Sequence, residues 1–259
     1  MRGTAAPEGE GKQNMIGTLA NAGMIAAGGC AGLLVRQGIS PKLEHAVHQA
    51  TGLAVIAIGL CGVMSNMLTA DTATGAVSSS GELMLVFSMV IGALIGESID
   101  IEARLNHLGE RIEQRLHLSG FAQGFVNGAL IYCVGAMAIV GSINDGLRGD
   151  PTVLITKGVL DGVTSIVLAA SMGPGVIFSA IPVLVYQGAL TLGAGLLAPV
   201  LQGELMRQIC AAGFLLVGCI GVNFLSDSFH IKVANFLPGL LVPAAWAGFH
   251  ALLAAAGIF

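Results

Sequence analysis

Two oppositely charged side chains, Lys157 and Asp161, stand in a largely apolar run from Val153 to Ala170. Four residues apart on a helix, they share one face and can pair. An ionisable residue inside a membrane costs at least ~2.5–3.5 kcal/mol on insertion scales, so it is by default a candidate functional residue. The pair could exchange a proton, hold a cation at Asp161 or bind an anion at Lys157. The alternative is an inert pair whose charges neutralise each other and so allow insertion.

Further polar candidates lie on both sides of this run. Before it, the stretch 144–150 contains Asp-Gly and Gly-Asp, which favour a tight hairpin. This hairpin is either a loop that caps the next helix or an acidic mouth of a pathway. After the run, Gly173-Pro174-Gly175 and Pro182 interrupt the chain, as in broken transporter helices or in simple proline kinks. The candidate side chains of these flanking segments are Asn144, Asp145, Asp150, Ser179, Gln187 and Thr191, and Ser165 is a further candidate within the run itself.

A carboxylate cluster stands at the end of another apolar segment. Gly92 and Gly96, four residues apart, favour close helix packing, and Glu97 and Asp100 follow them at the membrane edge. Glu97 is either a solvated helix-end residue or a ligand. From residue 100 to residue 118, apolar residues recur at helical spacing opposite charged ones. This pattern predicts an amphipathic helix that lies in the interface or extends the span.

The composition places these residues in a bilayer. Hydrophobic residues make up 54% of the chain and charged residues 10%, against about 25% charge in a soluble domain. The apolar runs are continuous rather than alternating, which indicates helices and not a barrel. No Lys/Arg cluster indicates nucleic acid, and the five cysteines lack the spacing of a disulfide framework or a zinc site. We therefore expect no nucleic-acid partner, metal or cofactor.

The elements that position the candidates are expected to be eight membrane spans in an all-α transmembrane bundle. They cover residues 15–35, 46–68, 83–96 (continuing toward Ile99), 121–143, 153–170, 176–197, 209–225 and 233–253. The fifth segment carries the charged pair and is the least secure, so that seven spans remain if it is re-entrant. Residues 15–259 are expected to form a single domain, and residues 1–14 a dispensable polar tail.

Two patterns describe how the spans are arranged. The basic residues of short loops fall on one side of eight spans, which we assign to the cytoplasm; they are Arg36, Lys42, Arg104, Arg111, Arg115 and Lys232. Weak matches also link segments one to three with segments six to eight, including Gly59 with Gly218 and Gly92 with Gly239. Copies displaced by five helices have opposite orientation, which predicts an inverted three-helix repeat typical of transporters. Glycine-rich helices also produce such matches by chance.

The order of several motifs resembles one family. The motifs are Met15–Thr18, Gly92–Glu102, Val134–Ser142, Asn144–Gly146, Gly149-Asp150, Lys157–Gly162, Phe178–Pro182 and Tyr186–Gly188. They are similar, from Met15 to about Ala244, to the YqgA-like membrane proteins, known as domain of unknown function 554. The resemblance implies a bacterial multi-pass membrane protein, described at most as a candidate transporter. It implies neither a substrate nor an established site.

The expected function is a secondary transporter or permease for a small solute or ion in the bacterial inner membrane. Lys157 and Asp161 are expected at its centre, with the bilayer as its surroundings. The alternative is a non-transporting scaffold or assembly partner that uses its glycine faces and amphipathic helix, and a homo-oligomer is compatible with either function. We do not expect an enzyme, because the chain has no nucleophile-elbow, zinc-protease or P-loop motif.

Overall fold

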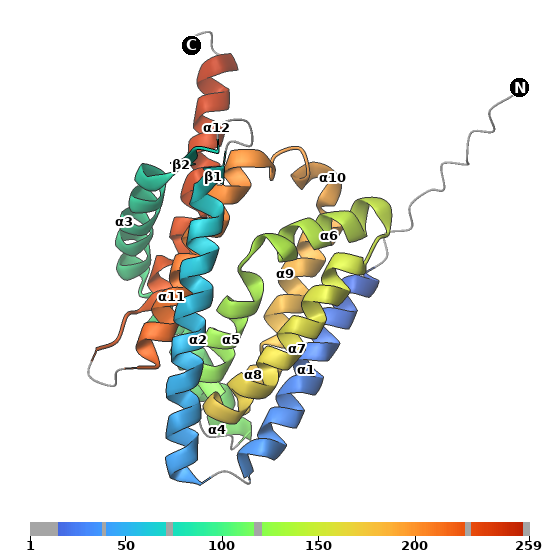
Figure 1. Cartoon of the computed structure of the whole chain (residues 1–259), viewed down its shortest axis with the longest axis vertical. Coiled ribbons are helices and arrows are strands. Elements are labelled where there is room, and N and C mark those ends of the chain that lie inside the picture. The colour runs from blue at the N-terminus through green and yellow to red at the C-terminus, as the bar shows by residue number, and fades with distance from the viewer. Residues whose placement is uncertain (1–14, 38–39, 71–74, 117–120, 226–228, 256–259) are drawn as a thin grey trace, which may run out of the picture.

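The computed structural model is a bundle of helices (Figure 1) and describes residues 15–37, 40–70, 75–116, 121–225 and 229–255. The long helices are α1 (Ile16–Gln37), α2 (Pro41–Met67), α3 (Glu82–Ile99), α7 (Thr152–Met172) and α11 (Gly203–Asn223). The shorter helices are α4 (Ile101–Leu116), α5 (Phe121–Cys133), α6 (Ala136–Arg148), α8 (Gly175–Phe178), α9 (Ala180–Leu192), α10 (Ala194–Leu197), the 3-10 helix η1 (Val233–Leu241) and α12 (Val242–Ala255). Strands β1 (Leu68–Ala70) and β2 (Val77–Ser79) form a small antiparallel hairpin with Thr69 opposite Ser78. The predicted tail, residues 1–14, lies outside the described residues.

The helices are long and apolar enough for a multi-pass membrane protein. Among the described residues, seven helical segments meet this test, two of which join α8 with α9 and η1 with α12. The number is eight if one bent pair of helices counts as a single span. The bent pair is α5 and α6, whose axes differ by 67°. The bend falls at Gly135, which has φ 117°, a backbone conformation that side chains other than glycine rarely adopt. The predicted all-α transmembrane fold is confirmed.

The fifth segment is a continuous helix, as the count of eight spans requires, so the re-entrant alternative does not apply, and the strongly bent segment is the fourth. α7 is a continuous helix of 21 residues, which at 1.5 Å per residue is long enough to cross a bilayer core. Its two charges pair within the helix, so they do not interrupt the backbone hydrogen bonds. In the fourth segment α5 ends at Cys133 instead, and the chain changes direction at Gly135 before α6 begins.

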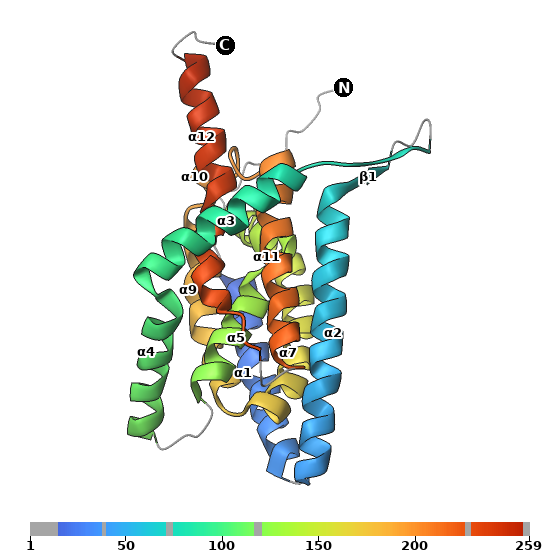
Figure 2. The ribbon, with the colours of Figure 1, turned by 90° about the vertical axis from the view of Figure 1, so that its left-hand side faces the viewer.

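The two ends of the bundle carry different segments. The end of α1, the start of α2, α4 and the end of α11 lie toward one end, whereas the β1–β2 hairpin, α10 and the connection from α6 to α7 lie toward the other (Figures 1 and 2). The segments with the predicted cytoplasmic basic residues therefore share one end. Where the sequence predicts an amphipathic helix, the structure has α4 over Ile101–Leu116, and residues 117 and 118 lie outside the described residues.

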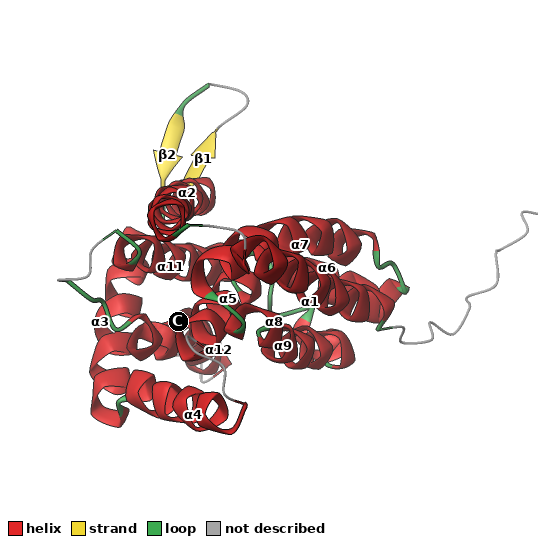
Figure 3. Ribbon diagram, turned by 90° about the horizontal axis from the view of Figure 1, so that it is seen from below, coloured by secondary structure: helices red, strands yellow, loops and turns green. Residues whose placement is uncertain are grey.

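The two predicted three-helix sets pack against each other in opposite directions. A Cβ atom at Gly59 of α2 would lie 2.5 Å from the backbone nitrogen of Gly218 of α11, and one at Gly92 of α3 would lie 2.6 Å from that of Gly239 of η1. Along α2, rising residue numbers meet falling numbers on α11, so these helices are antiparallel and lie side by side (Figure 3). Contact between matched residues of antiparallel helices is expected from a two-fold axis in the membrane plane, and it supports the inverted repeat.

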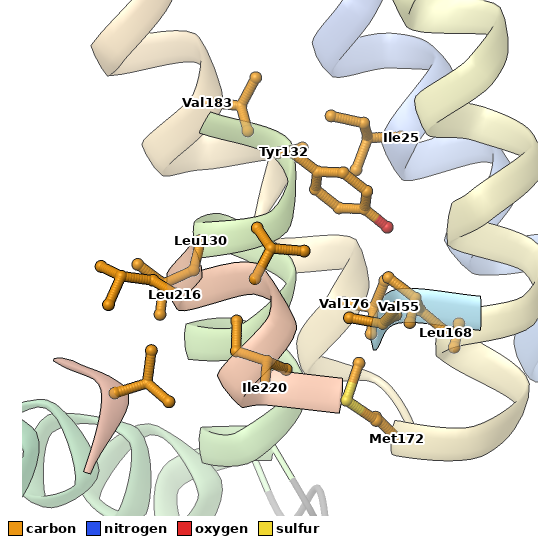
Figure 4. Close-up of a cluster of buried hydrophobic side chains, with 14 of the residues drawn as sticks. Ile25, Val55, Leu130, Tyr132, Leu168, Met172, Val176, Val183, Leu216 and Ile220 are labelled. Carbon is orange, nitrogen blue, oxygen red and sulfur yellow. The ribbon is translucent and has the colours of Figure 1, made fainter. Parts of the chain in front are cut away.

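The apolar surface is turned outward as well as inward. Large apolar side chains such as Leu34, Leu83 and Leu196 are 71%, 74% and 84% exposed, as expected for helices that face lipid. The interior is a cluster of buried side chains from α1, α2, α5, α7, α8, α9 and α11 (Figure 4). Tyr132 of α5 lies fully buried in this cluster.

We expect the stability of the bundle to depend on the close crossing of α2 and α11. The substitution Gly59→Ala forces two backbones apart and should lower the free energy of unfolding by about 1–3 kcal/mol, the usual cost of overpacking. Gly23→Ala on α1 is the matched control, because nothing lies within 4 Å of a Cβ atom there. It should leave stability unchanged or raise it by up to about 1 kcal/mol. Thermal unfolding of the purified proteins in detergent measures the stability of both variants. A loss of stability that is equal in Gly59→Ala and Gly23→Ala would contradict the close crossing.

Candidate functional site

Eight polar side chains from four helices meet inside the bundle and form what we call the buried polar cluster. They are Thr18 and Asn21 of α1, Asp145 of α6, Lys157, Asp161 and Ser165 of α7, and Gln187 and Thr191 of α9. Six of them are fully buried, while Lys157 is 6% exposed and the Asp161 side chain 13%. The structure thus brings together six of the ten residues predicted from the sequence, and adds Thr18 and Asn21.

The predicted pair forms within α7. Lys157 Nζ donates to Asp161 Oδ2 in an ion pair, with both side chains largely shielded from the surroundings. Gly158 and Gly162 let α1 approach, because Cβ atoms there would meet Asn21 and Met24. The pair therefore lies at a closed helix interface, where each charge satisfies the other.

Hydrogen bonds extend from the pair across α1 to α9. The Asn21 side chain bonds to the Asp161 carboxylate, and its Nδ2 donates to Gln187 Oε1 at 3.1 Å. One helical turn away, the hydroxyls of Thr18 and Thr191 lie 3.3 Å apart. α1 and α9 are the first helices of the two three-helix sets, so the buried polar cluster spans their interface.

Asp145 anchors the beginning of α1. Its side chain is fully buried, and Oδ2 accepts a hydrogen bond of 3.1 Å from the backbone N–H of Gly17. The first turn of a helix has free N–H groups and a positive dipole end, both of which stabilise a carboxylate. Asp145 therefore caps α1 from a distance of 128 residues along the chain.

The predicted hairpin at residues 144–150 is wrong in its extent. Asn144, which is half-buried, and Asp145 belong to the last turns of α6, and only Gly149 and the next two residues connect to α7. The exposed Asp150 accepts a 3.0 Å bond at Oδ1 from the Thr152 N–H, so it caps α7. Bonds from the Thr152 hydroxyl and N–H lower the pKa of Asp150. The loop-and-cap interpretation fits Asp150, whereas Asp145 is interior.

The two predicted serines, Ser165 and Ser179, have different surroundings. Ser165 Oγ lies 2.7 Å from the Tyr132 hydroxyl and donates to the Asp161 carbonyl at 2.7 Å, so it joins the end of α5 to the charged turn of α7. Ser179 lies apart from the cluster at the junction of α8 and α9, where its Oγ donates to the Val176 carbonyl. Tyr132 was not predicted from the sequence. The one sequence feature that could have indicated it is a tyrosine hydroxyl in an apolar segment, shortly before a glycine that breaks the helix.

Glu97 belongs to a second group of polar residues, at the junction of α3, α4 and η1. Its carboxylate accepts bonds of 2.7 Å from Lys232 and 2.6 Å from Asn235, and the bond to Glu97 raises the pKa of Lys232. The side chain of Glu97 is 60% exposed. It is therefore a solvated helix-end residue that fastens the start of η1 and not a member of the buried polar cluster.

Four buried polar atoms in or beside the cluster have no hydrogen-bond partner among the described residues. They are Asn21 Oδ1, Asp145 Oδ1, Gln187 Nε2 and Ser142 Oγ. Each such atom costs about 1–3 kcal/mol when left unpaired, so an ion, a water molecule or a polar solute would be bound favourably there. The atoms are two acceptors, an amide donor and a hydroxyl, which are the types of group that bind cations and small polar molecules.

Comparisons with known proteins find the same family over most of the chain. The family model described as "Protein of unknown function (DUF554)" matches residues 16–247. The "Uncharacterized membrane protein YdfK" of Bacillus subtilis is 31% identical over 229 residues, which cover 88% of this chain and 94% of YdfK. The "Uncharacterized protein YqgA" of Escherichia coli is 29% identical over 248 residues, which cover 92% of this chain and 100% of YqgA. No solved structure matches significantly.

The closed interface around the charged pair generates a prediction about stability. Asp161→Leu leaves Lys157 buried without its counter-charge and should cost about 3–5 kcal/mol of unfolding free energy. The double variant Lys157→Met/Asp161→Leu removes both charges and should unfold close to wild type. Thermal unfolding in detergent compares the three proteins. A double variant as unstable as the single one would show that the two charges are not each other's main partners.

Proposed function

The chain belongs to the DUF554 family, and we propose that it is a secondary transporter or permease for a small solute or ion. The observation that carries the proposal is the buried polar cluster, which holds a charged pair and unpaired hydrogen-bonding atoms inside an apolar bundle. Such groups are costly in lipid and mark ion and substrate pathways in membrane proteins. Helix packing alone would not require them, since the glycine crossings already bring the helices together.

The position of the cluster supports the same function. Transporters with inverted repeats bind their ions and substrates near the bilayer midplane, where the repeats meet. Asp161 is the tenth of the 21 residues of α7, so it lies close to the middle of that span. The contacts of Thr18 with Thr191 and of Asn21 with Gln187 join the two three-helix sets beside it.

We assign complementary roles to the charged and neutral groups. Asp161 accepts a proton or a cation, and Lys157 is its counter-charge while that ion is absent. Uptake of the ion frees Lys157 and changes the contacts of Asn21 with Asp161 and Gln187, which join α7 to α1 and α9. A shift of these contacts is the proposed link between ion binding and movement of the two three-helix sets.

We further propose the bacterial inner membrane as the location, with the α4 end of the bundle in the cytoplasm. The helical spans fit that membrane, and both relatives are bacterial proteins. The basic residues of the short connections and of α4 support the orientation.

Reconstitution tests transport directly. Proteoliposomes loaded with a pH-sensitive dye are exposed, one compound at a time, to a panel of small solutes and monovalent cations. We expect a compound-dependent change of internal pH with the wild-type protein and its loss with Asp161→Asn, because the amide cannot take up the proton. Glu110→Gln is the matched control, since the same chemical change then falls on the exposed surface of α4, and it should keep wild-type flux.

Two outcomes would contradict the proposal. The first is the absence of flux for every compound from protein that elutes as a single folded species. The second is unchanged flux in Asp161→Asn. Absent flux together with a stoichiometric co-purifying membrane protein would favour the alternative, a scaffold or assembly partner.

A further inference from the structure

A cavity of about 190 Å³, with both polar and apolar lining residues, lies between α4, α5, the end of α11 and the start of η1. We call it the vestibule. Its polar lining comes from α4, α5, the end of α11 and the residues before η1, and consists of Glu102, Asn106, Gln123, Asn127, Asn223 and His230. None of these residues belongs to the buried polar cluster, so the vestibule is a separate polar space.

The charged part of the vestibule lining is engaged in holding its wall. Glu102 Oε2 accepts a bond of 3.2 Å from the Ala234 N–H, and Oε1 lies 2.8 Å from the His230 ring. Asn223 exchanges two 2.8 Å bonds with the backbone of Ile231. The apolar part of the lining consists of Val126, Leu130, Ile231, Val233 and Ala234. The amides of Asn106, Gln123 and Asn127 complete the polar part, and amides both donate and accept hydrogen bonds without carrying charge. This chemistry suits an uncharged polar solute.

A second cavity, of about 220 Å³, lies at the break between α5 and α6. We call it the inner cavity. It is lined almost wholly by apolar residues of α5, α6, α9, α11 and η1, among them Leu130, Cys133, Val134, Cys210 and Leu240. Apolar cavities of this kind exclude water, and apolar constrictions close channels in the same way.

One face of α5 connects the two cavities. Gln123 and Asn127 line the vestibule, Leu130 lines both cavities, and Val134 lines the inner one. Spacings of four, three and four residues keep these side chains on one helical face. Along this face the exposure falls from the exposed Gln123 through the half-buried Asn127 to Leu130, which is 8% exposed, and rises again at the half-buried Val134. Leu130 is thus the most buried residue of the face, at the point where the vestibule meets the inner cavity.

We propose that the vestibule and the inner cavity form one route for a small uncharged polar solute along α5, closed at Leu130. The route rests on the proposed transport function and adds to it a path distinct from the charged pair. Successive residues at the end of α5 separate the two: Tyr132 bonds to Ser165 of α7, whereas Cys133 lines the inner cavity. The same contact lets a change at Asp161 reach α5 and move Leu130.

Native Cys133 provides a probe of this route that needs no knowledge of the solute. A variant that keeps Cys133 while Cys30, Cys61, Cys210 and Cys219 are replaced by alanine is reacted with uncharged methyl methanethiosulfonate, and mass spectrometry follows the rate. Leu130→Ala should speed the reaction by roughly tenfold, which corresponds to a barrier lower by about 1.4 kcal/mol. The trimethylammonium-ethyl analogue should gain much less, because the inner cavity offers no charged partner among its lining residues.

Matched variants separate an opened route from a loosened fold. Leu240→Ala enlarges the inner cavity from a residue that does not line the vestibule. It should leave the labelling rate of Cys133 near that of the protein with the native Leu130 and Leu240. Adding Asn127→Phe to Leu130→Ala fills the vestibule and should return the rate toward wild type. Leu130→Met keeps the volume of the side chain and should behave as wild type if folding is intact.

The outcomes distinguish the route from the function on which it rests. Equal acceleration by Leu240→Ala and Leu130→Ala, or no effect of Asn127→Phe, overturns the route. A larger gain for the cationic reagent than for the uncharged one overturns the assigned class of solute. Flux in proteoliposomes without the expected labelling pattern overturns the route alone, whereas the expected labelling without flux overturns the transport function.

Discussion

Close approach of helix backbones at glycine is the constraint on which the rest of this structure depends. Lipid gives helices no hydrophobic reason to associate, so packing must supply the attraction. Gly28 lies against the Gly162 carbonyl where α1 crosses α7, and Gly59 and Gly92 allow the crossings of α2 with α11 and of α3 with η1. Without the first crossing, Asn21 could not reach Asp161, and the polar groups of α1, α7 and α9 would not meet.

Only some of the charges and hydrogen-bonding atoms of the buried polar cluster have partners among the described residues. Lys157 and Asp161 neutralise each other, and Asp145 is held by the N-terminus of α1. Within the part of the chain that the structure describes, the amide pair of Asn21 and Gln187 keeps one unpaired atom on each partner, and Asp145 keeps an unpaired oxygen. A bundle that only needed to be stable would gain by pairing these atoms or replacing them. Their retention between two oppositely directed three-helix sets is the physical basis of the transport proposal.

Interrupted helices occur where the proposed solute route runs. α5 ends at Cys133 beside the left-handed Gly135, and η1 is a nine-residue 3-10 helix with Pro238 inside it. Runs of 3-10 helix this long are uncommon and often mark hinges or strain. The start of η1 is fastened by Glu97 and Glu102 through Asn235 and Ala234, so the wall of the vestibule is fixed near the surface while the break between α5 and α6 lies in the interior.

The sequence by itself determined the membrane class, the positions of the spans, the amphipathic α4 and the pairing of Lys157 with Asp161, because hydrophobicity and helical spacing are local properties. It also indicated the matches of Gly59 with Gly218 and of Gly92 with Gly239. Only the tertiary structure decided that the fourth span breaks while the fifth is continuous, since a paired charge leaves a helix intact and Gly135 does not. Only the tertiary structure shows the hydrogen bond between Asp145 and the Gly17 N–H and that between Tyr132 and Ser165. Contacts between residues far apart in the chain leave no local sequence pattern.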